Sequence, residues 1–191
     1  MTHVPYRDPD DLEASQRERL IDPWREHFGY VSLFRKVLLH DPDTLAAWDR
    51  YYRGVMTDGE DISGAEKEIA FVVAAAVDDC PYCIANHGEW LVEEHGYSMA
   101  EFERLVVGEF EGFTDRERAV ATVAEQLARD PSGVTGEHLR SLREVGFDDS
   151  DIVELFVAIC TLLSASALMQ GLDVDPGDAD RDLAAYAPDG R

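Results

Sequence analysis

Apolar residues recur at helical spacing along nearly the whole chain, and this periodicity limits the fold more than any other feature of the sequence. Leu45, Trp48, Tyr52 and Val55, for example, follow one another three or four residues apart, which places them on one face of a helix. No alternation typical of a strand and no Asn-Gly hairpin signal occurs. The sequence predicts an all-α fold, a helical bundle, with helices over residues 31–39, 44–56, 63–77, 81–95, 98–107, 114–129, 135–145 and 150–170.

Acidic residues dominate the charge of the 191-residue chain. Asp and Glu number 40 against 17 Lys and Arg, which gives a formal net charge of -23. Only Lys36 and Lys67 are lysines. Such an acidic, lysine-poor surface is typical of proteins from salt-loving organisms, because high salt screens its self-repulsion. The same charge repels phosphate backbones, so we expect no nucleic-acid partner.

The apolar segments of the chain favour a cytoplasmic protein. The N-terminus lacks the apolar core of a signal peptide, and the run Leu155–Met169 is too short and too rich in Ser and Thr to span a bilayer. We therefore expect no membrane partner. Cys160 lies within this run, where we expect it to pack as a small hydrophobe.

The other two cysteines form the motif Cys80-Pro81-Tyr82-Cys83, which His87 follows. Proline suits the first position of a helix, so Cys80 is expected near the N-cap and Cys83 in the first turn. Backbone N–H groups and the helix macrodipole there favour a thiolate. Cys83 and His87 are four residues apart and share a helical face. The motif predicts a dithiol beside a proton acceptor, which is the minimum for thiol redox chemistry.

Glu68 is the fourth candidate for the site. If the helices on either side of the motif's turn form a hairpin, Glu68 and His87 lie at a similar level and can interact directly or through one water. A carboxylate on the buried edge of a helix needs such a partner. The neighbouring Lys67 is expected to point to another face. We infer that Glu68 orients the imidazole of His87, which then accepts the proton of a motif thiol.

The spacing of these residues resembles a known signature. Glu68, eleven intervening residues, a CxxC and a histidine after three more residues are similar to the pattern of the alkylhydroperoxidase D and carboxymuconolactone decarboxylase superfamily. The segments 63–68 and 114–119 resemble those of its peroxidase-related branch. The likeness predicts three parts, which are an N-terminal extension (1–27), an alkylhydroperoxidase D-like helical domain built around the CxxC hairpin (28–174) and a C-terminal tail (175–191).

The resemblance implies a homo-oligomer, as dimers, trimers or hexamers, and a peroxidase cycle that needs no metal, haem or other cofactor. In this cycle a hydroperoxide oxidises Cys83 to a sulfenic acid, and Cys80 resolves it as a disulfide. An external dithiol or thiol protein then restores both cysteines. Glu68 and His87 relay the proton in this scheme.

Two positions depart from the superfamily's pattern. Tyr82 stands where a well-studied member has a second histidine, which implies a simpler proton relay. Residues 163–166 read Leu-Ser-Ala-Ser, whereas many members of the branch carry an Asn-Arg pair in this last long helix.

Other interpretations of the motif remain open. Cys-Pro-Tyr-Cys is also the glutaredoxin tetrapeptide, but that fold needs a strand immediately before it. Zinc could be bound by Cys80, Cys83 and His87, with His95 or Glu68 as fourth ligand, although a second paired set of ligands is missing. An acid–base enzyme like the lactone decarboxylases would use only the histidine and the glutamate, and a non-catalytic helical protein would merely pack the cysteines.

Overall fold

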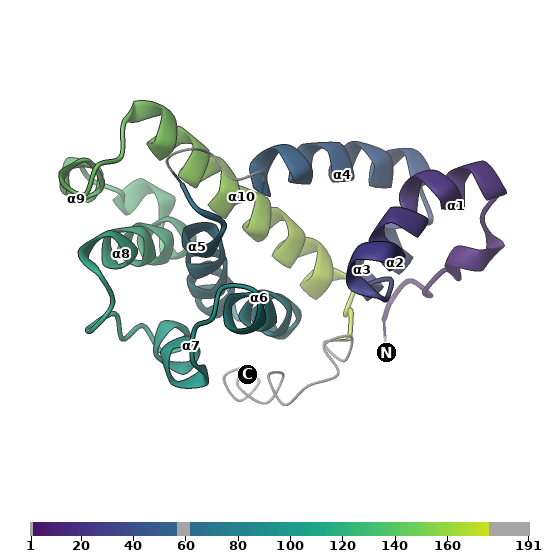
Figure 1. Cartoon of the computed structure of the whole chain (residues 1–191), viewed down its shortest axis with the longest axis horizontal. Helices are drawn as coiled ribbons and strands as arrows, with labels where there is room; N and C mark the ends of the chain where they lie inside the picture. The colour runs from purple at the N-terminus through teal and green to yellow at the C-terminus, as the bar shows by residue number, and fades with distance from the viewer. Residues whose placement is uncertain (1, 57–61, 176–191) are drawn as a thin grey trace.

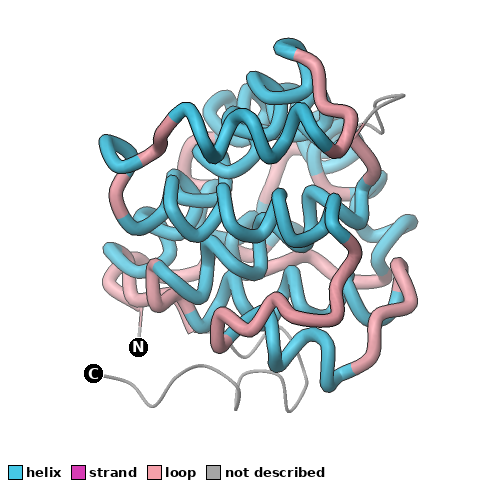
Figure 2. Tube along the Cα trace, turned by 90° about the vertical axis from the view of Figure 1, so that its left-hand side faces the viewer, coloured by secondary structure: helices cyan, strands magenta, loops and turns pink. Residues whose placement is uncertain are grey.

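The computed structural model describes residues 2–56 and 62–175, which form helices and loops without a strand (Figure 2). The predicted all-α fold is therefore confirmed. The described α-helices are α1 (Ala14–Leu20), α2 (Asp22–Phe28), α3 (Leu33–Leu38), α4 (Pro42–Met56), α5 (Gly64–Val77), α6 (Pro81–Glu93), α7 (Met99–Val106), α8 (Asp115–Arg129), α9 (Gly136–Glu144) and α10 (Asp149–Gly171). Two short 3-10 helices lie at η1 (Pro9–Asp11) and η2 (Pro131–Gly133).

Local capping explains where several of these helices begin. Ser63, Ser98 and Thr114 each accept a hydrogen bond from the backbone N–H of a glutamate three residues on, whose carboxylate bonds back to the cap. These reciprocal bonds satisfy N–H groups that the first turn of a helix leaves open. The sequence missed α1 and α2, and it placed the start of α4 two residues late.

Helix α10 lies between the two halves of the molecule (Figure 1). Helices α5 to α9 lie on one side of it and α1 to α4 on the other, and α10 packs against α5, α8, α4 and α6. Helix α5 packs against α8, α6, α10 and α7. The motif-bearing helix α6 thus starts beside the central α5, deep in the bundle.

The apolar residues form two clusters rather than one. The larger joins α5 to α10, with Val37 and Val55 from the N-terminal half. The smaller lies in the N-terminal half and consists of Leu12, Leu20, Ile21, Val31, Leu39 and Leu45. Three of these residues belong to the segment 1–27, so that segment is part of the packed structure of the N-terminal half.

Helix α10 is longer than the apolar run that the sequence analysis considered. By length and composition alone its 23 residues would suffice to cross a membrane, so the argument that the run is too short was wrong. Leu155, Ala158 and Ile159 of this helix are instead fully buried among the other helices. The core helix of a bundle can pass the same test of length and composition, and 44% of the apolar window of α10 is buried among the other helices.

The structure adds to the picture of two single residues. Lys67, expected on another face than Glu68, is completely buried, because four helices enclose α5. Its Nζ donates to the backbone oxygen of Val55 at 2.8 Å and pairs with Glu154 Oε1 at 2.7 Å. Cys160 is exposed rather than packed, because the apolar run of α10 extends beyond the face that the bundle covers.

Candidate active site

The turn between α5 and α6 brings the two cysteines of the motif together. Asp79 has a positive φ of 54°, and the N–H of Cys80 bonds back to the oxygen of Ala75 at 3.0 Å. This tight turn lets Pro81 begin α6 with Cys80 as its N-cap, as the sequence predicted. The two sulfur atoms are 2.9 Å apart, and both cysteines are buried and reduced. A disulfide between them requires only a small further approach.

The N-terminus of α6 acts on Cys80 rather than on Cys83. The backbone N–H of Cys83 donates to Cys80 Sγ at 3.3 Å. From the sequence, this stabilisation of a thiolate was expected for Cys83 in the first turn. The cap position receives it instead, because a side chain at the N-cap folds back over the open N–H groups. The geometry therefore favours negative charge on Cys80 in the resting protein.

The hydrogen bond between the thiols separates their two ionisations. Together with bonds from Ser166 and the backbone, it lowers the pKa of Cys80 to about 7, against the opposing effect of burial. The same bond, with burial, raises the pKa of Cys83 well above its usual range. The pair therefore loses one proton near neutral pH and retains the other, so that one negative charge is shared between two sulfurs.

Glu68 and His87 are in direct contact, as the sequence analysis expected. Glu68 Oε2 lies 2.8 Å from His87 Nδ1, and the carboxylate is almost completely buried. Phe71 and Trp90 meet the imidazole edge to face, at centroid distances of 4.8 and 5.4 Å. These contacts fix the orientation of the ring. Because Glu68 occupies Nδ1, the other ring nitrogen is the one available for proton transfer.

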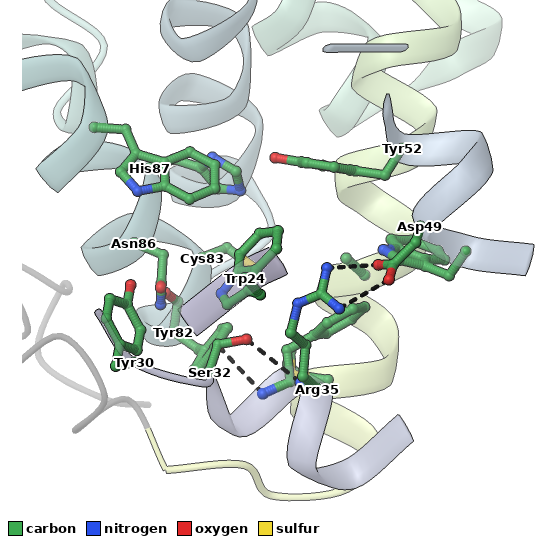
Figure 3. Close-up of a pocket in the computed structure, with 15 residues that line it drawn as sticks. Trp24, Tyr30, Ser32, Arg35, Asp49, Tyr52, Tyr82, Cys83, Asn86 and His87 are labelled. Atoms are coloured by element: carbon green, nitrogen blue, oxygen red, sulfur yellow. Dashed lines mark hydrogen bonds and ion pairs between the residues drawn. The ribbon is translucent and has the colours of Figure 1, made fainter. Parts of the chain in front are cut away.

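Cys83 and His87 line one wall of a cavity of about 80 Å³, whereas Cys80 does not reach it (Figure 3). At about 10–15 Å³ for each water, this is room for roughly five to eight waters. The opposite wall comes from the N-terminal half of the chain. Aromatic rings predominate in the lining, from Trp24, Tyr30, Phe34, Trp48, Tyr52, Tyr82 and Trp90.

A buried ion pair holds the N-terminal wall in place. Arg35 donates to both carboxylate oxygens of Asp49, at 2.9 and 2.6 Å, and its guanidinium lies 3.7 Å from the centre of a Trp24 ring. Both charged side chains line the cavity but neutralise each other. The pocket therefore presents aromatic surface with little net charge from this pair.

A hydrogen-bonded group on α10 supports the cysteine pair from the other side. The buried Ser166 hydroxyl donates to the carboxylate of Asp78, and Gln170 Nε2 bonds to Ser166 Oγ at 3.0 Å and to the backbone oxygen of Asp78 at 2.9 Å. Ser166 also lies beside the thiols and helps to lower the pKa of Cys80. Sequence analysis noted this position only as a departure from a family pattern. The sequence signal for this hydrogen-bonded group was a serine in an apolar helix with a glutamine four residues later.

The described residues do not bring three metal-binding side chains together. Over residues 2–56 and 62–175, no group of three His, Cys, Asp or Glu side chains has the geometry of a metal site. Within that range His95, which was considered as a fourth zinc ligand, is exposed beyond the end of α6. Glu68, the other candidate, bonds to the ring of His87.

Comparisons with known proteins show what the chain is similar to. Residues 42–126 match the carboxymuconolactone decarboxylase family. Sestrin-2 of Pongo abelii is 29% identical over 160 residues, which cover 78% of this chain, and the chain spans only 31% of that relative.

Solved structures share the fold. The alkylhydroperoxidase AhpD core of an uncharacterized peroxidase-related protein from Ralstonia eutropha JMP134 is 22% identical, with a TM-score of 0.81 and 93% of each chain covered. The debrominase Bmp8 in complex with 2,3,4-tribromopyrrole is 15% identical, with a TM-score of 0.83 and 98% of each chain covered. The segment 42–126 that matches the family model contains Glu68, both motif cysteines and His87, and this match supports the predicted resemblance to the alkylhydroperoxidase D and carboxymuconolactone decarboxylase superfamily.

Proposed function

We propose that the protein is a thiol-dependent peroxidase that reduces organic hydroperoxides. The observation that carries this proposal is the position of Cys83, which lines the pocket beside His87 while Cys80 Sγ lies 2.9 Å behind its sulfur. A substrate in the pocket meets one sulfur directly. The second sulfur is already within reach of the first, so that oxidation can end in a disulfide.

The proposed cycle starts with the negative charge shared by the two sulfurs. When the remaining proton moves from Cys83 to Cys80 or His87, the Cys83 thiolate attacks the outer oxygen of the hydroperoxide. The S–O bond forms, the O–O bond breaks, and the alkoxide leaves as an alcohol once it is protonated. Cys80 then attacks the sulfenic sulfur, the disulfide forms, and the hydroxyl group leaves as water.

An external dithiol completes the proposed cycle. It attacks the disulfide, takes over the oxidised state and returns both cysteines to thiols. Cys83 is the sulfur that such a reductant reaches, because Cys80 is fully buried and does not line the pocket. Glu68 serves here as a positioning residue that keeps His87 oriented for proton transfer.

Peroxide consumption tests the proposal. With dihydrolipoamide as donor in high salt, we expect turnover by the wild type, none by Cys83→Ser, and a single oxidation without turnover by Cys80→Ser. Cys160→Ser is the matched control, since this exposed thiol lies outside the pocket, and it should keep wild-type activity. Undiminished turnover by Cys83→Ser would contradict the proposal.

The aromatic pocket supports a second candidate, the reductive dehalogenation of a small aromatic ring. A protein of the same fold is a debrominase with 2,3,4-tribromopyrrole bound. In such a reaction two thiols become a disulfide, a carbon–bromine bond becomes carbon–hydrogen, and bromide is released. Bromide release from a bromopyrrole, without peroxide consumption, would favour this candidate. Turnover that survives loss of both motif cysteines would favour an acid–base reaction at Glu68 and His87 instead.

We also propose that the protein is a cytoplasmic homo-oligomer, as a dimer, trimer or hexamer. Val153 and Val157 on α10 are 63% and 38% exposed, and Tyr51 on α4, which packs against α10, is 46% exposed. Apolar side chains grouped on neighbouring helices fit a surface that a second copy covers. Sedimentation velocity in high salt tests this, and a monomer at micromolar concentration would contradict it.

A further inference from the structure

Tyr52 on α4 carries a hydroxyl for which the fold provides no partner. Its ring lines the pocket, and its hydroxyl points across the pocket toward His87 (Figure 3). Within the described ranges 2–56 and 62–175, this hydroxyl has no hydrogen bond. The neighbouring Tyr51 differs, because its hydroxyl lies 2.8 Å from Thr161 Oγ1. Tyr52 is partly buried, and a phenol hydroxyl that faces a pocket without a bond to the protein is placed to bind a ligand.

The surroundings of Tyr52 keep this hydroxyl protonated. Burial raises its pKa well above the usual value, the negative charge of Glu68 acts in the same direction, the positive charge of Arg35 opposes it, and a thiolate at Cys83 would raise the pKa further. The hydroxyl is therefore a hydrogen-bond donor near pH 7, where Cys80 ionises. It also lies close enough to Cys83 and Glu68 to interact electrostatically with both.

We propose that Tyr52 is a catalytic residue whose hydroxyl donates a hydrogen bond to the leaving oxygen of the substrate. This inference rests on the peroxidase activity proposed above. As Cys83 takes the outer oxygen, negative charge develops on the inner oxygen, which becomes an alkoxide. A neutral donor held in the pocket stabilises this charge without reorganisation. The alkoxide takes the hydroxyl proton of Tyr52 and leaves as an alcohol, and water returns a proton to the Tyr52 phenolate. His87 then serves the thiol while Tyr52 serves the leaving group.

The position of Tyr52 on α4 gives this role a structural basis. The ring is carried by the N-terminal half of the chain, whereas Cys83 and His87 lie on α6. In the proposed reaction, the wall formed by α6 provides the nucleophile, and the wall formed by α4 provides the hydrogen-bond donor to the leaving group. A hydroperoxide bound between them has its two oxygen atoms directed toward different walls.

The variant Tyr52→Phe tests the proposal with two oxidants that differ in their leaving groups. The reaction of tert-butyl hydroperoxide releases a strongly basic alkoxide that needs a donor, whereas peracetic acid releases acetate, which needs none. Removal of one preorganised donor costs about 10²–10³-fold in rate. We expect a loss of about that size with tert-butyl hydroperoxide and little change with peracetic acid, measured as disulfide formation in single turnover.

The Tyr51→Phe variant is the matched control, because its hydroxyl bonds to α10 outside the pocket, and both oxidants should react as with wild type. An undiminished rate of Tyr52→Phe with peracetic acid also shows that the thiol pair is intact. Equal losses with both oxidants, or no loss with either, would overturn the role of Tyr52. A wild-type protein that reacts with neither oxidant would instead overturn the proposed peroxidase function.

Discussion

The two motif sulfurs, 2.9 Å apart, hold one proton between them near neutral pH. Because the pKa of Cys80 is lowered to about 7, its thiolate forms as pH rises through that value and is lost as pH falls below it. The hydrogen bond from Cys83 is the largest cause of this shift. The neighbouring thiol, more than the helix terminus that the sequence indicated, determines the charge of the pair.

Replacement of Cys83 tests whether its hydrogen bond lowers the pKa of Cys80. In Cys83→Ala we expect the pKa of Cys80 to rise toward the ordinary thiol range, because the bonds from Ser166 and the backbone are the smaller causes. The ultraviolet absorbance of the thiolate as a function of pH measures this, in a Cys160→Ser background that removes the exposed thiol. If the titration midpoint of Cys80 stays near 7, the contacts with Ser166 and the backbone are enough to lower its pKa, and the explanation is wrong.

The Glu68–His87 contact gives a second prediction for single residues. His87→Ala and Glu68→Gln should slow the reaction of the thiol pair with peroxide by about 10²–10⁴-fold at neutral pH, the usual size of a general-base contribution. Partial recovery at higher pH should follow, as the thiol ionises unaided. Stopped-flow measurement of sulfenic acid or disulfide formation gives the rates.

Two exposed residues at the C-terminal end of α6 provide controls for these variants. His95→Ala and Glu94→Gln change the same residue types on the surface and should be nearly silent. If the His87 and Glu68 variants react as fast as these controls, the proton relay is wrong, and the thiols must work through their mutual hydrogen bond and the helix terminus alone.

Among the helices, α5 has the greatest consequence for the site. It carries Glu68, leads into the turn before Cys80, and is enclosed by α6, α7, α8 and α10. Its capping box and apolar stripe predicted its extent closely. The number of its neighbours was not predictable from its own pattern, since a helix with one open face and an enclosed helix can share the same stripe.

Lys67 provides a test of this enclosure. Its ammonium joins α5 to the end of α4 and to Glu154 on α10. Lys67→Ala should lower the free energy of unfolding by about 2–4 kcal/mol, because it leaves a cavity and an unpaired buried carbonyl. The ion pair itself adds little to this loss, since Glu154 is partly exposed and can turn to water.

Thermal and urea unfolding measure the effect, with Lys36→Ala as a control on a less buried lysine of α3. Residual activity of the folded Lys67 variant should remain, because Lys67 is not among the residues that line the pocket. An unfolding free energy equal to that of wild type would mean that the buried bonds of Lys67 contribute nothing net.

The net charge of -23 acts on the molecule as a whole. Self-repulsion is screened over about 3 Å at 1 M salt but reaches about 30 Å at 0.01 M. We expect the melting temperature to rise with salt concentration and the proposed oligomer to dissociate as salt is removed. Circular dichroism and sedimentation across this range measure both effects, and unchanged stability and mass would refute the idea.

Features that depend on near neighbours in the chain were predictable from the sequence. Helical periodicity and caps predicted most helices, and the spacing of the motif predicted the contact between Glu68 and His87, which are only 19 residues apart. Both follow from the fixed rise and turn of an α-helix. The exclusion of a strand-based glutaredoxin fold had the same local basis.

Only the tertiary structure decided the features that require distant segments to meet. The aromatic wall and Tyr52 come from α2 to α4, Ser166 comes from α10, and neither segment carries a local pattern that points to the cysteines. The burial of Lys67 and the exposure of Cys160 likewise depend on which faces other helices cover. Periodicity shows that a face is apolar, but only the packing of the whole chain determines what lies against it.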